Sequence, residues 1–173
     1  MSRNNPVGAT DLIGRSNVSK ADARIEALGA VDEAAAALAF ARGLTPDANS
    51  KAELKKCQAE LSVIMGALAG LDSASQTALG MRSKIQAALE RLMAAIRHLQ
   101  SIIPNPQAFV LAGESPASGA LDLARTVVRR AERRVVQMYA EQGPNDELIL
   151  EYLNKLSTLV YMLELSAMQE EID

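Results

Sequence analysis

The feature that most constrains the fold is the segment 116–141, in which apolar residues recur every three or four positions. An α-helix brings such positions onto one side, so this segment is predicted to form a long amphipathic helix. Ser115 and Pro116 suit its start, as an N-cap and a proline in the first turn. The predicted apolar face, which other helices must cover, contains Leu121, Ala124, Val127, Val128, Ala131, Val135 and Met138.

Four further segments have helical periodicity and cover about 22–42, 51–70, 82–100 and 146–170; the first three end at turns that contain glycine, proline or serine. Residues 1–19 are polar, lack a sustained period and are predicted to form a loop or arm; no alternating strand pattern is found. The 49% hydrophobic and 3% aromatic content, without Trp, is typical of packed helices. We expect one all-α domain over 1–173, an up-and-down five-helix bundle (21–170) preceded by an arm (1–20).

Composition argues against several classes of protein. The single cysteine, Cys57, excludes an intrachain disulfide and a cysteine-cluster metal site, and it is expected to be a small core residue. The start of the chain lacks a secretory apolar region, and no apolar run is long enough to span a bilayer. With a net charge of −3 and no continuous basic face, nucleic-acid binding is not expected. We expect a soluble cytoplasmic protein without membrane partners or metal-ligating side chains.

Five arginines crowd into residues 125–134 of this acidic chain. On a helical wheel Arg130 and Arg134 lie opposite the apolar face, where we expect them to be solvated. Arg125, Arg129 and Glu132 form one column beside that face. The column is either an intrahelical ladder of ion pairs, worth a few tenths of a kcal/mol per pair, or part of a site.

Asp32 is the second unusual residue, because its neighbours on the predicted helix are Ile, Leu, Gly and Ala. In the middle of an apolar face an unpaired carboxylate would cost several kcal/mol, so we expect an arginine of another helix or another subunit to pair with it. Glu33, one step round the helix, is expected to be solvated. On the last helix Asn154, Ser157, Thr158 and Tyr161 form a polar column, which either bonds within the bundle or binds a ligand. His98 is expected to be an ordinary surface or structural residue.

These patterns resemble a known family. "FVLAGESPASGALDLARTVVRRAERRVV" (109–136), followed by "EYLNKLS" (151–157), is similar to the motifs of PduO-type ATP:cob(I)alamin adenosyltransferases. Their pattern reads approximately F-V-L-P-G-G-S-P, then A-R-T-V-x-R-R-A-E-R, then Y-L-N-R-L-S-D. "VSKADARIEALGAVDE" (18–33) and "CQAELSVIMGALAG" (57–70) also resemble segments of this family. The resemblance covers nearly the whole chain.

The resemblance implies a homotrimer with active sites between subunits. ATP, with Mg²⁺, would meet cob(I)alamin there as the second substrate; cobalt(I) would attack the ribose 5′-carbon and release triphosphate. The protein would supply orientation and charge stabilisation. A corrinoid reductase and an adenosylcobalamin-dependent enzyme are the further partners that the resemblance implies.

Positions matched to the family imply roles for particular residues. Arg129 and Arg125 would organise the triphosphate, Glu132 would hold the geometry, and Asn154 would contact the nucleotide. Asp32 would pair with Arg125, across the subunit interface. The nucleotide-binding positions kept in the N-terminal arm are Gly8, Thr10 and Lys20, and Phe109 would close the lower face of the corrin.

Several positions depart from the family pattern. Asn4-Asn5-Pro6 replaces T-G-D in the nucleotide loop, which removes a flexible glycine and one backbone N–H. Thr158 replaces Asp, Ala112 replaces Pro and Glu114 replaces Gly. Three alternatives therefore stay open: an active corrinoid adenosyltransferase, a paralogue that binds corrinoid or nucleotide without transfer, and a helical interaction protein without a small ligand.

Overall fold

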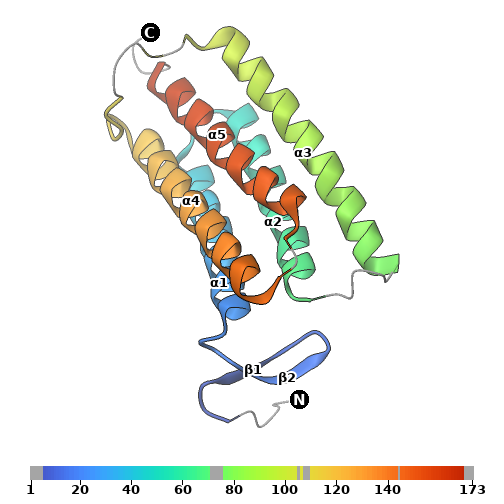
Figure 1. Cartoon of the computed structure of the whole chain (residues 1–173). Coiled ribbons are helices and arrows are strands. Elements are labelled where there is room, and N and C mark those ends of the chain that lie inside the picture. Colours follow the sequence, from blue (N-terminus) through green and yellow to red (C-terminus); the bar gives the residue numbers. More distant parts are fainter. Residues whose placement is uncertain (1–5, 71–75, 105, 107–109, 144, 170–173) are drawn as a thin grey trace.

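The computed structural model describes residues 6–70, 76–104, 106, 110–143 and 145–169. Within them the expected five-helix bundle is confirmed. Figure 1 shows the helices side by side along one long axis, with the two-stranded hairpin beyond one end. The elements are β1 (Ala9–Leu12), β2 (Arg15–Ser19), α1 (Ala23–Leu44), α2 (Ala48–Leu68), α3 (Gln76–Ile102), α4 (Pro116–Gln142) and α5 (Glu147–Gln169).

Local capping explains where three of the helices begin. Asp22 and Asp47 are the N-caps of α1 and α2, and their carboxylates accept hydrogen bonds from backbone N–H groups of the first turn. These bonds hold the pKa of both carboxyls below its ordinary value; for Asp22 the largest cause is a side-chain hydrogen bond from Gln142. At α4, Ser115 forms a capping box with Ser118 and Pro116 follows, as the sequence predicted.

The core runs along the bundle and contains buried residues of all five helices. Helix α1 packs against α4 and α2, α5 packs against α4 and α3, and α3 also contacts α2. All seven residues of the predicted apolar face of α4 are buried. Cys57 is a fully buried core residue, as expected, and burial raises the pKa of its thiol to about 12. None of the helices in the described part of the chain is apolar over enough residues to cross a membrane.

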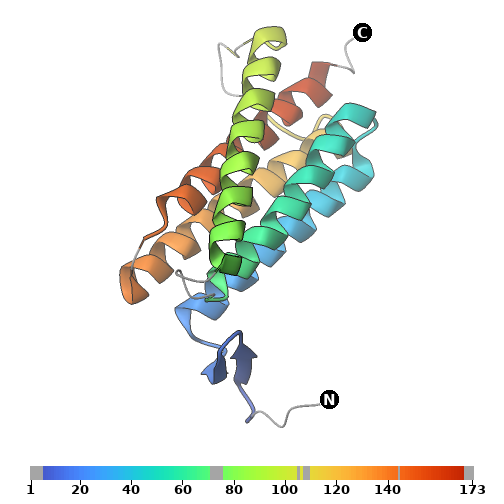
Figure 2. The same cartoon turned by 90° about the vertical axis from the view of Figure 1, so that its right-hand side faces the viewer.

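The prediction that the N-terminal arm lacks strands was wrong. β1 and β2 pair antiparallel, with Thr10 opposite Val18, and Gly14 turns between them with a φ of 75°. The hairpin extends beyond the end of the helices (Figures 1 and 2). Periodicity did not reveal it because every residue of the two strands is exposed or only partly buried, so backbone hydrogen bonds rather than an apolar face define the pairing.

Candidate functional site

The arginines of α4 point to different sides of the helix. Arg130 Nη2 lies 2.6 Å from Glu33 Oε2, and Arg134 Nε lies 3.1 Å from Glu26 Oε1. Both carboxylates belong to α1, so these arginines, although exposed, are not simply solvated as the wheel suggested. The correction has a tertiary cause: α1 lies alongside α4 and places its own exposed carboxylates within reach. These two pairs bridge the α1–α4 surface, and exposed pairs of this kind contribute little stability.

On the other side, α4 and α5 form a polar groove of about 290 Å³, which we call the α4–α5 groove. Asn154 Nδ2 donates a hydrogen bond to Glu132 Oε1 at 3.1 Å, across the two helices. Arg129 and Arg133 line the groove and are exposed; neither has an ion pair or hydrogen bond in the described part of the chain. The groove therefore presents two guanidinium groups without a bonded partner among the described residues, next to the hydrogen-bonded Glu132 and Asn154. The lining residues are Arg129, Glu132, Arg133, Val136 and Asn154.

Two other residues of the polar column of α5 bond within their own helix. The hydroxyls of Ser157 and Thr158 donate to the Asn154 carbonyl at 2.8 and 3.4 Å. Of the two interpretations left open for this column, internal bonding therefore holds for Ser157 and Thr158, whereas Asn154 presents its amide to the groove. His98 is exposed on α3, as expected.

Arg125 lies on the α5 side of α4 but is already engaged by carboxylates of its own chain. Its Nη2 and Nε donate to Asp122 Oδ1 at 2.5 and 3.1 Å, and its Nε lies 3.6 Å from Glu164 Oε2. Glu164 is 2% exposed. Burial, then the Asp122 charge, raise the pKa of the Glu164 carboxyl to about 7, while Arg125 acts in the opposite direction.

Asp32 is exposed in the single chain, so the expectation that it lies in a buried apolar face was wrong within one subunit. The buried side of α1 consists of Ala27, Ala30, Val31, Ala34, Leu38 and Ala41. Helix α1 is rich in alanine on two sides, and a helical wheel cannot tell which of them packs inside the chain. Asp32 has no partner in the described residues, and its pairing with Arg125 of another subunit stays a prediction.

The structure brings the kept N-terminal positions together in the hairpin. The backbone N–H of Lys20 donates to the Gly8 carbonyl at 2.8 Å, and Thr10 lies in β1. Gly8 has a φ of 85°, which favours glycine. Phe109 and Asn4-Asn5 lie outside the described residues. Glu114 is exposed, directly before the N-cap of α4.

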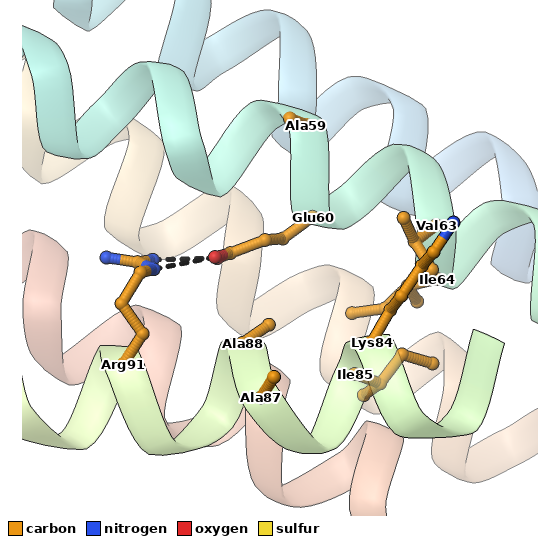
Figure 3. Close-up of a pocket in the computed structure, with 9 residues that line it drawn as sticks. All are labelled: Ala59, Glu60, Val63, Ile64, Lys84, Ile85, Ala87, Ala88 and Arg91. Carbon is orange, nitrogen blue, oxygen red and sulfur yellow. Dashed lines mark hydrogen bonds and ion pairs between the residues drawn. The ribbon is translucent and has the colours of Figure 1, made fainter. Parts of the chain in front are cut away.

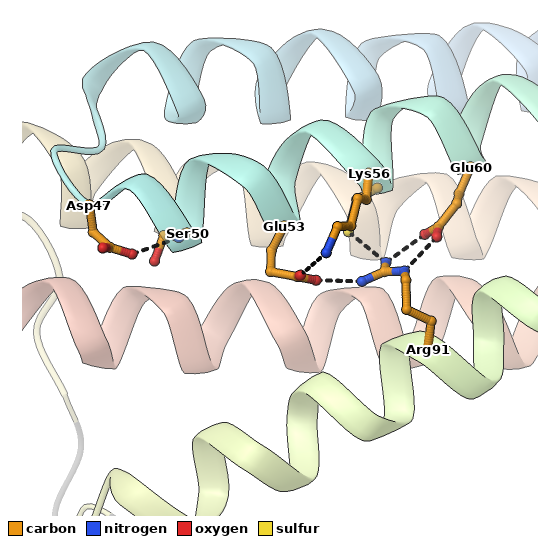
Figure 4. Close-up of polar contacts among 7 residues, drawn as sticks. Asp47, Ser50, Glu53, Lys56, Glu60 and Arg91 are labelled. Atoms are coloured by element: carbon orange, nitrogen blue, oxygen red, sulfur yellow. Dashed lines mark hydrogen bonds and ion pairs between the residues drawn. The ribbon is translucent and has the colours of Figure 1, made fainter.

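A second polar cluster joins α2, α3 and α5. Arg91 binds Glu60 through two bonds of 2.6 and 2.7 Å and also pairs with Glu53, as Figure 4 shows. Tyr152, which is fully buried, donates from its hydroxyl to Glu60 Oε2 at 2.6 Å. Burial raises the pKa of this phenol well above its ordinary value. We call Glu53, Glu60, Arg91 and Tyr152 the Arg91 cluster.

The Arg91 cluster borders a hollow of about 360 Å³ between α2 and α3 (Figure 3). Its walls are mostly apolar, and Glu60 and Arg91 point toward each other at one end. Glu60 and Arg91 bind each other, so their polar groups are not free to bind a ligand in the hollow. The hollow therefore resembles a packing defect more than a binding site.

Sequence reasoning missed Asp122, Arg133 and Glu164. Asp122 stands three residues before Arg125, a spacing that brings side chains together on a helix. Glu164 is a single charged residue in the apolar run "LVYMLELSAM" (159–168), and that isolation was a usable signal. For Arg133 only its position one turn from Arg129 pointed to the groove.

Comparison with known proteins identifies the family of the chain. The family described as cobalamin adenosyltransferase matches residues 1–167. Corrinoid adenosyltransferase PduO of Salmonella typhimurium is 33% identical over 93% of this chain and 47% of its own length. A corrinoid adenosyltransferase of Citrobacter freundii is 34% identical over 90% of this chain and 87% of its own. The chain thus spans about half the length of the PduO relatives and most of the shorter one.

Solved structures agree with these relatives. A variant PduO-type ATP:corrinoid adenosyltransferase from Lactobacillus reuteri, complexed with cobalamin and ATP, superimposes with a TM-score of 0.81 at 25% identity, over 95% of this chain and 88% of that one. Another variant of that enzyme, complexed with ATP, has a TM-score of 0.79 at 26% identity, over 92% and 89%. With a matching family over nearly its whole length and the same helical fold, this chain belongs to the cobalamin adenosyltransferase family.

Proposed function

We propose that this chain transfers the 5′-deoxyadenosyl group of ATP to the cobalt of cob(I)alamin, forming adenosylcobalamin and releasing triphosphate. The observation that carries the proposal is the α4–α5 groove, in which Arg129, Glu132 and Asn154 lie together. These are the residues to which the resemblance assigns the nucleotide. Relatives named corrinoid adenosyltransferase, and related structures that hold ATP and cobalamin, support the same reaction.

The reaction needs little chemistry from side chains. The reduced cobalt of the corrinoid substrate supplies an electron pair to the ribose 5′-carbon, a carbon–cobalt bond forms, and the bond from that carbon to the triphosphate oxygen breaks. Negative charge grows on the leaving triphosphate, so fixed cations beside it lower the barrier. Arg129 and Arg133 have free donors for this role, while the Glu132–Asn154 hydrogen bond would fix the side of the groove that holds the nucleoside.

The N-terminal hairpin would complete the nucleotide site. Lys20 is exposed at its base, next to the turn at Gly8, and a lysine there could reach phosphate oxygens. The described residues contain no group of three or more His, Cys, Asp or Glu side chains that could hold a metal ion. Mg²⁺ would enter the site with ATP, bound to its phosphates, as is common for this ion.

We also propose that the working form is a homotrimer with the site between subunits. The hairpin extends beyond the end of its own helices (Figure 1), and the Asp32 side of α1 is exposed, so both are available to a second copy. Asp32 would then pair with Arg125 of a neighbour, and Phe109 would close the corrin side. The proposal also includes a cytoplasmic location. Its further partners would be a corrinoid reductase and an adenosylcobalamin-dependent enzyme.

An anaerobic transfer assay tests the proposal. The protein is mixed with chemically reduced cob(I)alamin and ATP–Mg²⁺, and the spectrum is followed for conversion to adenosylcobalamin. Conversion that is lost in Arg129→Ala but kept in Arg97→Ala, an exposed arginine on α3, supports it. Binding of ATP or corrinoid without conversion would replace it with the alternative of a paralogue that stores, delivers or senses these ligands.

A further inference from the structure

Glu164 is a buried carboxyl group to which the proposed reaction gives no role. Its Oε2 atom is inaccessible to solvent and has no hydrogen-bond partner. The closest cationic atom is Arg125 Nε at 3.6 Å, which is beyond normal hydrogen-bond length. A buried acceptor without a donor costs free energy, so a native structure that retains one calls for a reason.

The arrangement around Arg125 suggests that reason. A guanidinium has five N–H donors in a planar fork, so one edge can be bound while another stays free. Nε and Nη2 both donate to Asp122 Oδ1, and Glu164 approaches the same Nε edge. Nη1 has no partner among the residues that the structure describes. Asp122 therefore binds one edge of Arg125, with the Glu164 carboxyl beside it, and the opposite edge is left for an anion from outside the chain.

The charge of Glu164 decides how strongly that free edge attracts an anion. The charged groups that face Glu164 are Asp122 and Arg125, both on α4. One turn earlier on its own helix is the Tyr161 phenol, and the apolar residues that pack near this end of α5 in the described part of the chain include Leu99, Ile103 and Val110. With Glu164 ionised, one guanidinium faces two carboxylates and the cluster is anionic. With Glu164 protonated, the cluster is neutral and an incoming anion meets less repulsion.

We propose that Glu164 is a positioning residue for Arg125. It lies beside the Nε edge of the guanidinium that Asp122 binds, and by taking up a proton it makes the free edge a stronger receptor for the anion that completes the site. This proposal rests on the proposed function, in which that anion is the Asp32 carboxylate of a second copy of the chain. Beyond that function, it states that proton uptake by Glu164, a residue outside the α4–α5 groove, controls how tightly the subunits assemble.

The first test observes Arg125 directly and needs neither activity nor assembly. The ¹H–¹⁵N resonance of its Nε–H group is followed by NMR from about pH 5.5 to 8.5 in the wild type, in Glu164→Gln and in Glu151→Gln, an exposed carboxylate of the same helix. We expect a titration with a midpoint of about 7 in the wild type and in Glu151→Gln, and none in Glu164→Gln. The same titration in Glu164→Gln would overturn the proposal.

Asp122→Asn gives a second, independent variant. Because the Asp122 charge raises the pKa of Glu164, its removal should move the midpoint of the Arg125 titration to lower pH without abolishing it. An unchanged midpoint would show that the two carboxylates do not act on Arg125 together. This result does not depend on whether Glu164→Gln folds.

Sedimentation velocity then tests whether the anion is Asp32 of a second copy of the chain. Association of the wild type should be roughly tenfold tighter at about pH 6 than at about pH 8.5, and Glu164→Gln should associate tightly at both. If the protein is monomeric throughout, or Glu164→Gln keeps the wild-type pH dependence, Asp32 of a second copy is not the anion. A chain that assembles and titrates as expected but does not convert cob(I)alamin would remove the proposed function and leave the role of Glu164 standing.

Discussion

The Arg91 cluster and the α4–α5 side of the bundle are both built from arginines and carboxylates, yet they differ in how completely the groups are paired. In the Arg91 cluster the guanidinium binds Glu60 through two bonds and Glu53 through a third, and Tyr152 donates to Glu60 as well. On the α4–α5 side, Arg129 and Arg133 have no partner among the described residues, and Glu164 Oε2 has no donor.

We propose that this difference separates a structural cluster from a ligand-binding one. A cluster in which donors and acceptors are paired with each other stabilises the packing of three helices and has nothing left to offer a ligand. A cluster with unpaired cations and an unpaired buried acceptor gains its partners only when another molecule arrives. The four predictions below test this contrast, from the largest expected effect to the smallest.

Removing a groove arginine should affect catalysis and not stability. Arg129→Ala should lower kcat/KM for adenosyl transfer by about 100-fold or more, because a fixed donor to a developing charge is worth about 3–4 kcal/mol. Because Arg129 has no bonded partner among the described residues, its removal leaves no charged group unpaired. The free energy of unfolding of the variant should therefore stay within about 0.5 kcal/mol of the wild type. Anaerobic kinetics and urea unfolding measure both quantities. A variant that unfolds easily would mean that Arg129 belongs to the structural kind of cluster.

Arg91→Met should show the reverse pattern. It leaves Glu53 and Glu60 without their cation, at a site where the arginine side chain is 26% exposed. We expect a loss of about 3 kcal/mol in the free energy of unfolding, with transfer kinetics nearly unchanged in the protein that remains folded. Arg82→Ala is the matched control, since Arg82 pairs with Asp146 while 60% exposed and should cost less than about 1 kcal/mol. Equal losses in the two variants would contradict the contrast.

Glu164 should give the protein a pH-dependent stability that Glu164→Gln lacks. Burial raises the pKa of this carboxyl from 4.5 to about 7, so the native state holds the proton more tightly than the unfolded chain. The contribution of this group to the free energy of unfolding is therefore largest at low pH. It falls by about 2 kcal/mol between about pH 5 and about pH 7 and is nearly constant above that range. Urea unfolding at fixed protein concentration measures the difference between wild type and variant. A difference that does not change with pH would exclude the titration.

The pairing of Asp32 with Arg125 should appear as coupling in a double-mutant cycle. If the two meet between subunits, Asp32→Asn and Arg125→Ala each weaken assembly, and the double variant should be less damaged than the sum, with a coupling of about 1–2 kcal/mol. Sedimentation equilibrium measures the association free energies. Glu33→Gln serves as the control, because Glu33 already pairs with Arg130 of its own chain and should not couple to Arg125. Strict additivity for Asp32 and Arg125 would show that they do not meet.

The helices were predictable from sequence because each carries a local signal: a periodic apolar face, a cap, or a terminating glycine or proline. The predicted start of α4 at Ser115-Pro116 is confirmed, and the structure adds a capping box with Ser118. The hairpin was not predictable in this way, since β1 and β2 have no buried face. The site residues Arg129, Glu132 and Asn154 followed from a column of charges and a family motif, and the structure gathers them in one groove.

The sequence by itself determined which segments are helical, although α3 begins six residues before its predicted start, which face of α4 is apolar, and to which family the chain belongs, because these depend on residue types and their spacing along the chain. Only the tertiary structure decided which charges meet. Arg130 and Arg134 reach Glu33 and Glu26 because α1 lies against α4, and Arg125 meets Glu164 because α5 does. It also decided that Asp32 faces outward, since both sides of α1 are apolar and only the packing of neighbouring helices selects one of them for the core.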